Sequence, residues 1–162
     1  MITNGKYKLL SDFSKDLVRI ATLDDGLPFI SAKAKEIIGA DRCSVFILDL
    51  DRNELWTTLS DGVEKIVVPF DMGLAGHTIR TKKAIMENDA YSNSNFLSDI
   101  DMKTGYYTQN ILTSPIINSD REVIGVFQLL NKENGFKKED LEFITFFAHY
   151  VSGFLELELK NL

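Results

Sequence analysis

Small residues at the start of a predicted helix are the first feature of this sequence that could carry chemistry. Gly73-Leu74-Ala75-Gly76 opens a helix predicted over residues 74–81. The first N–H groups of a helix lack intrahelical acceptors, and the helix dipole adds positive potential at the same end. The amides of Leu74 and Ala75 could therefore hold a singly charged phosphodiester without an arginine. The same glycines also suit an ordinary helix cap, so the pattern needs support from other polar groups.

Such groups occur in one long connection and on two predicted strands. The connection spans residues 88–109, and loops of this length in a compact domain usually carry function. Its candidate ligand-binding side chains are Asp101, Thr104, Tyr106, Tyr107 and Thr108. They suit ribose and phosphate oxygens, and they also suit a capped loop. On the strands, Ser44 and Gln128 are polar among apolar neighbours, which for Gln128 are predicted to be Ile124, Val126 and Leu130. If buried, both side chains need a partner from the backbone or a ligand.

Residues for an enzyme active site are sparse. His77 and His149 are better interpreted as surface or hydrogen-bonded histidines, and Cys43 as an inert buried thiol. One cysteine excludes an internal disulfide and argues against a metal site built on Cys and His. Neither a phosphate-cradling loop with its lysine nor a His-Glu-x-x-His motif is present. The sequence therefore predicts a binding domain with no catalytic residues and no metal.

Hydrophobic periodicity predicts the order helix, helix, three strands, helix, long loop, two strands, helix. One domain over residues 1–162 is expected, with N-terminal helices at 6–39, sheet and lid at 42–131, and a C-terminal helix at 138–160. Within the first part, a helix over 6–22 is expected to break at Asp24-Asp25-Gly26, with Pro28 in the first turn of the next helix. The predicted class is α+β: the terminal helices pack on one face of an antiparallel sheet, and a ligand pocket lies under the lid on the other.

The last predicted helix is apolar on two sides. Either the first two helices of the same chain or a second copy of the chain could cover the additional side.

Composition limits the class of protein further. The 162 residues carry a formal charge of −6, with 44% hydrophobic and 26% charged residues, which is typical of one globular domain. The acidic balance argues against a nucleic-acid partner. The N-terminus lacks an apolar signal core, and the most apolar stretch, residues 143–155, is too short and interrupted to span a bilayer. A cytoplasmic domain without membrane contact is expected.

A series of motifs in register covers almost the whole chain. They are Gly73-Leu74-Ala75-Gly76-His77, Asn88-Asp89-Ala90-Tyr91, Phe96, Asp101, Thr104-Gly105-Tyr106, Thr108, Asn110-Ile111-Leu112, Pro115-Ile116, Val123-Ile124-Gly125-Val126 and Asn131-Lys132. In these motifs the chain resembles a GAF domain, specifically the subgroup found in cyclic-nucleotide phosphodiesterases and some bacterial adenylyl cyclases.

The resemblance implies a buried cyclic nucleotide in front of the sheet. cAMP is favoured over cGMP because it is the commoner ligand among bacterial relatives. The implied ligand-binding residues are Ser44, Asp61, Leu74, Ala75, Leu97, Asp101, Thr104, Thr108 and Gln128. The family signature implies a structural clasp formed by Asn131, Lys132, Phe136 and Asp140, in which a Lys132–Asp140 ion pair fixes the last strand to the last helix.

The sequence departs from the family pattern at two places. Leu141 replaces the final Glu of the signature, and Ser60 replaces an aromatic residue that stacks on the base. Loss of that stacking platform could remove about 1–3 kcal/mol of binding energy. Gln128 stands where a Glu often occurs, and its amide can pair with an adenine or a guanine edge.

Three functions are compatible with the resemblance. The favoured one is a regulatory domain that binds a cyclic nucleotide and signals through its terminal helices, as a homodimer, to an output domain such as a diguanylate cyclase or phosphodiesterase. The second is a dimerisation module without nucleotide binding. The third, reduction of methionine sulfoxide, needs several cysteines, whereas Cys43 stands alone.

Overall fold

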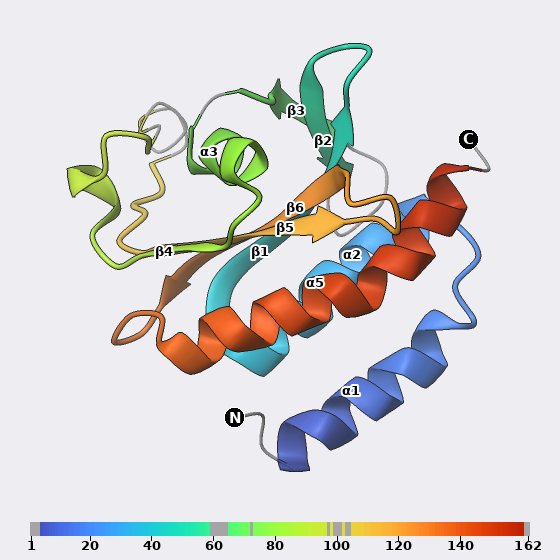
Figure 1. Cartoon of the computed structure of the whole chain (residues 1–162). Coiled ribbons are helices and arrows are strands. Elements are labelled where there is room, and N and C mark those ends of the chain that lie inside the picture. The colour runs from blue at the N-terminus through green and yellow to red at the C-terminus, as the bar shows by residue number, and fades with distance from the viewer. Residues whose placement is uncertain are drawn as a thin grey trace.

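A six-stranded antiparallel sheet forms the centre of the structure (Figure 1). The structure is a computed structural model, and it describes residues 4–58, 65–71, 73–96, 98, 102 and 105–160. The strands are β1 (Ala40–Asp49), β2 (Glu54–Thr58), β3 (Lys65–Pro69), β4 (Ile85–Glu87), β5 (Ile111–Ile117) and β6 (Val123–Lys132), in the order β3-β2-β1-β6-β5-β4. The helices are α1 (Asn4–Leu17), α2 (Leu23–Ile38), α3 (Gly73–Thr81) and α5 (Lys138–Leu159), with a 3₁₀ turn, η1 (Ala90–Ser92). The predicted α+β class is confirmed.

Helices α2 and α5 cover one face of the sheet, and α1 lies outside them (Figure 1). Every second residue of β1, β5 and β6 points into this layer, because side chains alternate between the two faces of a strand. The large buried side chains of this core include Phe13, Leu27, Ile30, Ile47, Leu112, Phe127, Phe143 and Phe147. None of the described helices has the length and apolar character needed to cross a membrane.

The junction between α1 and α2 differs from the prediction. Helix α1 ends at Leu17, and the Asp24-Asp25-Gly26 segment that was expected to break the chain forms the first turn of α2. Thr22 caps that turn, because its hydroxyl accepts a hydrogen bond from the Asp25 amide at 3.2 Å. Pro28 consequently lies inside α2 and not in its first turn.

Helix α3 lies on the opposite face of the sheet, where two small apolar clusters replace a continuous core (Figure 1). One cluster is built from Phe46, Leu55, Ala75 and Val126, and the other from Leu74, Ala90 and Ile111. Between them a buried hydroxyl pair, Thr78 on α3 and Thr113 on β5, joins the helix to the sheet with an Oγ–Oγ distance of 2.5 Å. Polar side chains are therefore part of the packing between α3 and this face of the sheet.

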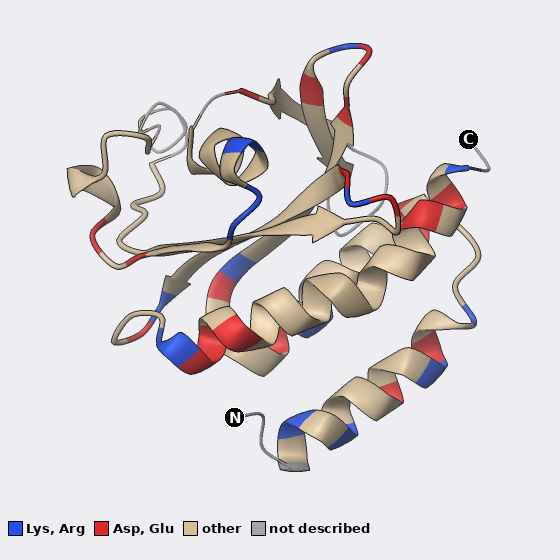
Figure 2. Cartoon of the chain, viewed as in Figure 1, with Lys and Arg blue, Asp and Glu red and all other residues tan. Residues whose placement is uncertain are grey.

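Charged residues lie mainly at the ends and turns of the elements (Figure 2). Strand β5 has none, and β6 has only Lys132, at its last position. At the opposite end of β6, the turn to β5 is tied to the last turns of α5. Ser119 donates to Glu156 through its hydroxyl at 2.6 Å and its amide at 3.3 Å, and the hydroxyl bond lowers the pKa of Glu156.

Gly125 is required where β6 passes β1. A Cβ atom at this position would lie 2.5 Å from the carbonyl oxygen of Phe46, and a backbone atom in a sheet cannot move aside easily. We expect Gly125→Ala to lower the free energy of unfolding by about 1–3 kcal/mol in urea titrations. Gly153→Ala is the matched control, because a Cβ there meets nothing within 4 Å, and it should raise stability by about 0.5–1 kcal/mol. Equal effects of the two substitutions would contradict this account.

Candidate functional site

Ser44 and Gln128 lie directly opposite each other on β1 and β6, on the face covered by α3. Thr113 of β5 pairs with Gln128 and completes a polar row across three strands. Ser44 and Gln128 are half-buried, and neither side chain is hydrogen-bonded to a described residue. A half-buried amide and hydroxyl without partners are costly unless water or a ligand satisfies them. The row is therefore a candidate recognition surface.

The apolar neighbours of Gln128 differ in one respect from the prediction. Val126 and Leu130 belong to the clusters under α3, as expected. Ile124 packs instead against the core on the face covered by α2 and α5. A register shift at Ile116 and Ile117 of β5 changes the pairing at this end of β6, and simple alternation in the sequence does not predict it.

Leu74 and Ala75 occupy the first turn of α3, which is the position expected for a phosphate-binding helix start. Both side chains are buried in the two apolar clusters, and the helix end therefore sits firmly on the sheet. No described residue outside the helix accepts a hydrogen bond from either amide. The two N–H groups thus remain available on the same side of the sheet as Ser44 and Gln128.

The end of the long connection is fastened to β6 by Asn131. Its Oδ1 accepts from the amides of Gln109 at 2.7 Å and Asn110 at 3.2 Å, and its Nδ2 donates to the Tyr107 carbonyl at 2.8 Å. Thr108 lies within this stretch and is buried. Asn131 therefore holds the lid to the sheet, whereas the sequence placed it in the clasp between the last strand and the last helix.

Tyr106 joins the same lid segment to the start of β1. Its hydroxyl donates to Asp41 Oδ2 at 2.6 Å and accepts from Asn131 Nδ2 at 3.0 Å. The guanidinium carbon of Arg42 lies 3.7 Å from the centre of the Tyr106 ring. Burial, followed by the hydrogen bond to Asp41 and its charge, raises the pKa of Tyr106 to about 12.

This pKa has a measurable consequence at high pH. The unfolded chain loses the Tyr106 proton near pH 10, whereas the folded chain retains it to about pH 12. The contribution of Tyr106 to stability is thus complete below pH 10 and is lost as the pH rises from about 10 to 12. We expect one tyrosine to titrate late in an ultraviolet absorbance titration, and Tyr106→Phe to remove that step. An unchanged late step in the variant would assign it to another tyrosine.

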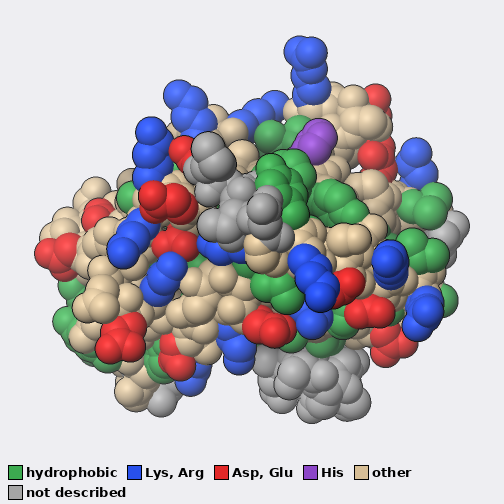
Figure 3. Space-filling model, turned by 90° about the horizontal axis from the view of Figure 1, so that it is seen from below, with side chains coloured by type: hydrophobic (Ala, Val, Ile, Leu, Met, Phe, Trp, Pro, Cys, Tyr) green, Lys and Arg blue, Asp and Glu red, His purple; other side chains and the backbone are tan. Residues whose placement is uncertain are grey.

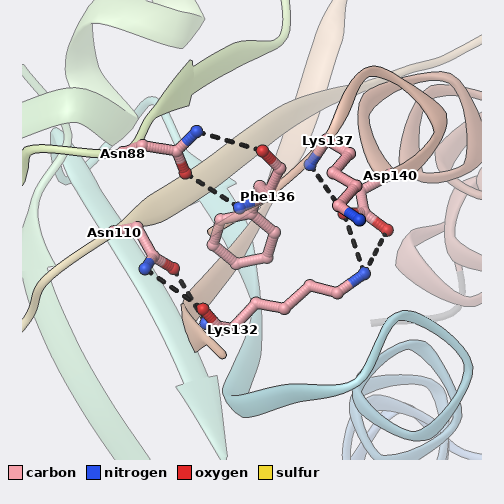
Figure 4. Close-up of polar contacts among 6 residues, drawn as sticks. All are labelled: Asn88, Asn110, Lys132, Phe136, Lys137 and Asp140. Atoms are coloured by element: carbon pink, nitrogen blue, oxygen red, sulfur yellow. Dashed lines mark hydrogen bonds and ion pairs between the residues drawn. The ribbon is translucent and has the colours of Figure 1, made fainter. Parts of the chain in front are cut away.

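Lys132, Asp140 and two asparagines form a cluster where β6 leads into α5 (Figure 4). Lys132 Nζ lies 2.8 Å from Asp140 Oδ1 and 2.9 Å from Oδ2, and the Lys137 amide donates to Oδ2 at 2.8 Å. The Asp140 carboxylate is 2% exposed, whereas the Lys132 side chain is 24% exposed and keeps some contact with water. The ion pair expected from the signature is present. Leu141 packs against the core.

The side-chain amides of the two asparagines in this cluster pair with main-chain N–H and C=O groups, as a neighbouring strand would. Asn88 accepts from the Phe136 amide at 2.8 Å and donates to its carbonyl at 3.0 Å, while Phe136 itself is buried. Asn110 makes the equivalent pair of bonds to the backbone of Lys132, at 2.8 and 3.2 Å. Both ends of the lid are thereby attached to the β6–α5 connection. The sequence pattern contains both residues but does not predict this role.

Several of the predicted residues cannot be placed. Asp61, Leu97, Asp101 and Thr104 lie outside the described residues, as does Ser60. Among the described residues no group of three or more His, Cys, Asp or Glu side chains could hold a metal ion. Cys43 packs against the core between the sheet and helices α2 and α5, where burial raises the pKa of its thiol and keeps it protonated.

Two hollows open on the surface away from the Ser44–Gln128 row. One, of about 400 Å³, lies beside the lid and is lined by Asn88, Asp89, Tyr91, Tyr107, Gln109, Asn110, Asn134 and Gly135. The other, of about 450 Å³, lies at the far ends of β1 and α5, and its lining includes Asp49, Asp51, Trp56, Glu122 and Leu159. Neither is lined by Ser44, Gln128, Leu74 or Ala75.

The antiparallel sheet carries the terminal helices on one face, and on the other face a polar row lies beneath a short helix. Residues 23–155 match the GAF domain family, and the chain belongs to that family of regulatory domains. It is 40% identical over 110 residues to proteins named cGMP-specific 3′,5′-cyclic phosphodiesterase from Drosophila melanogaster and Drosophila mojavensis. The match covers 65% of this chain and 10% of each relative, so the chain spans about a tenth of their length.

Solved structures share the fold at low sequence identity. The GAF domain of a phosphoenolpyruvate-protein phosphotransferase from Coxiella burnetii is 20% identical, with a TM-score of 0.84 and 98% of both chains covered. The free methionine-R-sulfoxide reductase of Neisseria meningitidis is 15% identical, with a TM-score of 0.76, and the match covers 95% of this chain and 90% of that one. The fold therefore occurs both in a GAF domain of a phosphotransferase and in a reductase, and it does not by itself define a function.

Proposed function

We propose that this GAF domain binds a 3′,5′-cyclic nucleotide between α3 and the sheet. The observation that carries the proposal is the facing pair Ser44 and Gln128, half-buried and without a partner among the described residues. The base would meet these two side chains, and the cyclic phosphate would meet the amides of Leu74 and Ala75. Thr108, together with Asp61, Leu97, Asp101 and Thr104, would complete the site from the lid and the β2–β3 connection.

The relatives named cGMP-specific support a cyclic nucleotide as the ligand but do not support the preference for cAMP inferred from the sequence. The Gln128 amide can both donate and accept, so it suits either purine edge. The proposal therefore covers both nucleotides. A direct comparison of their affinities tests the expectation that cAMP binds more tightly than cGMP.

Isothermal titration calorimetry with cAMP and cGMP tests the proposal. Binding should release heat and should raise the melting temperature in proportion to the logarithm of ligand concentration above the dissociation constant. Neither heat nor a melting shift at millimolar concentrations of both nucleotides would refute it.

The proposed signal travels from the lid to the terminal helices. Asn88 and Asn110 attach both ends of the lid to the end of β6 and the connection that leads into α5, so ordering of the lid by a ligand would change the packing there. We propose that α1 and α5 pass this change to an output domain, such as a diguanylate cyclase or a phosphodiesterase, in a homodimer.

A dimerisation module without ligand is the second candidate. The observation in its favour is a set of exposed apolar side chains on α1 and α5, namely Tyr7, Leu9, Phe146, Tyr150 and Leu157. Figure 3 shows that exposed hydrophobic groups on this side of the molecule are surrounded by charges of both signs. Sedimentation with and without nucleotide separates the two candidates, since a tight dimer that ignores both nucleotides would favour this one.

A further inference from the structure

Arg42 is a charged residue beside the Ser44–Gln128 row that the sequence patterns did not single out. It lies two residues before Ser44 on β1, so both side chains point to the α3 face about 7 Å apart along the strand. Its neighbour across the strands is Leu130, which is paired in turn with Ile111. Leu74 and Ile111 belong to one apolar cluster, and Leu130 packs against that cluster. Arg42 therefore lies one strand away from the position where the first turn of α3 meets the sheet.

The Arg42 guanidinium is held in place but makes no polar contact with a described residue. The ring of Tyr106 supports it at 3.7 Å, and Asp41 and Asn131 fix that ring through its hydroxyl. The Asp41 carboxylate accepts the short bond from Tyr106, and among the described residues it forms no ion pair with Arg42. An arginine carries five N–H donors, and here all of them remain available while its plane is already oriented.

An available cation matters for anion binding because the chain as a whole is negatively charged. The chain has a formal charge of −6, which by itself opposes the approach of an anion. Strands β1 and β6 carry only two cations, Arg42 and Lys132. Lys132 is engaged by both oxygens of Asp140, so Arg42 is the cation of these two strands that a bound anion can reach.

We infer that Arg42 is a ligand-contacting residue that donates to the phosphate of the bound cyclic nucleotide; this rests on the proposed function. The guanidinium would approach the phosphate from β1 while the amides of Leu74 and Ala75 approach it from α3. A charge-assisted hydrogen bond from arginine to a phosphate oxygen is stronger than a neutral one. The Tyr106 ring serves as a positioning group, because it sets the guanidinium plane before the ligand arrives.

The test compares Arg42→Gln with Arg52→Gln in calorimetric titrations with cAMP and cGMP. Arg52 lies in the turn between β1 and β2 and is exposed, so its substitution removes the same charge from a distant place. We expect Arg42→Gln to weaken binding of both nucleotides by the same factor, about 10- to 100-fold. Arg52→Gln should change affinity less than about 2-fold. Arg42→Lys should fall between wild type and Arg42→Gln, because it keeps the charge but loses the planar fork.

Two further readouts separate a phosphate contact from a structural role. Wild-type affinity should fall with added salt more steeply than that of Arg42→Gln, and adenosine and guanosine, which lack phosphate, should bind both proteins equally. Equal affinity of wild type and Arg42→Gln for cyclic nucleotides would overturn the inference alone. A loss for only one base, or an equal loss for the nucleosides, would also overturn it. Failure of the wild-type protein to bind either nucleotide would overturn the proposed function and this inference together.

Discussion

Lys132→Met is expected to lower the free energy of unfolding by about 3 kcal/mol. The substitution keeps the aliphatic stem but leaves the carboxylate of Asp140, 2% exposed, without its cation. Removing one partner from a buried ion pair is costly because the other charge stays out of water without compensation. For a domain of this size, the melting temperature should fall by about 6–12 °C, measured by differential scanning calorimetry.

Lys33→Met provides the matched control. Lys33 pairs with Glu36 at 3.4 Å on the surface of α2, where their side chains are 32% and 60% exposed, so its loss should change stability by less than about 0.5 kcal/mol. Adding Asp140→Asn to Lys132→Met should recover part of the loss of stability, since the neutral amide leaves no unpaired charge in the interior. If Lys132→Met is no more damaging than Lys33→Met, the ion pair does not stabilise the β6–α5 junction.

Gln128→Leu should weaken cyclic-nucleotide binding about 10- to 100-fold without reducing stability. Leucine has a similar volume but can neither donate to nor accept from a purine edge, and a base bound against it would lose its hydrogen bonds. The amide makes no hydrogen bond to a described residue, so the substitution breaks none within the described part of the chain. Calorimetric titration measures the affinity, and thermal melting without ligand measures the stability.

Gln109→Leu applies the same chemical change outside the proposed pocket. Its side chain lines the hollow beside the lid and is exposed, while only its backbone amide bonds to Asn131. Affinity of this variant should stay within about 2-fold of wild type. Undiminished binding by Gln128→Leu would remove this residue from the site, and a drop in melting temperature would indicate that Gln128 has a structural role.

The sequence predicted most of the fold because the relevant signals are local. Alternation located β2, β-branched and aromatic residues located the hydrophobic part of β1, and a hairpin pattern located β5. The apolar residues of α5 recur over enough turns to predict a helix. The start of α2 was wrong for a physical reason. Asp-Asp-Gly is typical of a break, but after Thr22 the same acidic residues suit the first turn of a helix.

The site was predictable only in part. Polar residues on apolar strands, such as Ser44 and Gln128, are visible as exceptions in a periodic pattern. Asn88 and Asn110 bond to main-chain groups that are 48 and 22 residues away in the sequence. A local sequence pattern does not reveal which distant residues come into contact. Arg42 was overlooked because an arginine near a strand end looks like a solvated residue until Tyr106 is brought against it.

The bond between Ser119 and Glu156 has a mechanical consequence. It ties the final turns of α5 to the β5–β6 turn through one carboxylate that accepts two hydrogen bonds. We therefore expect a displacement of this turn to reach the C-terminal end of α5 through Glu156, at the end of the helix opposite to Lys132 and Asp140.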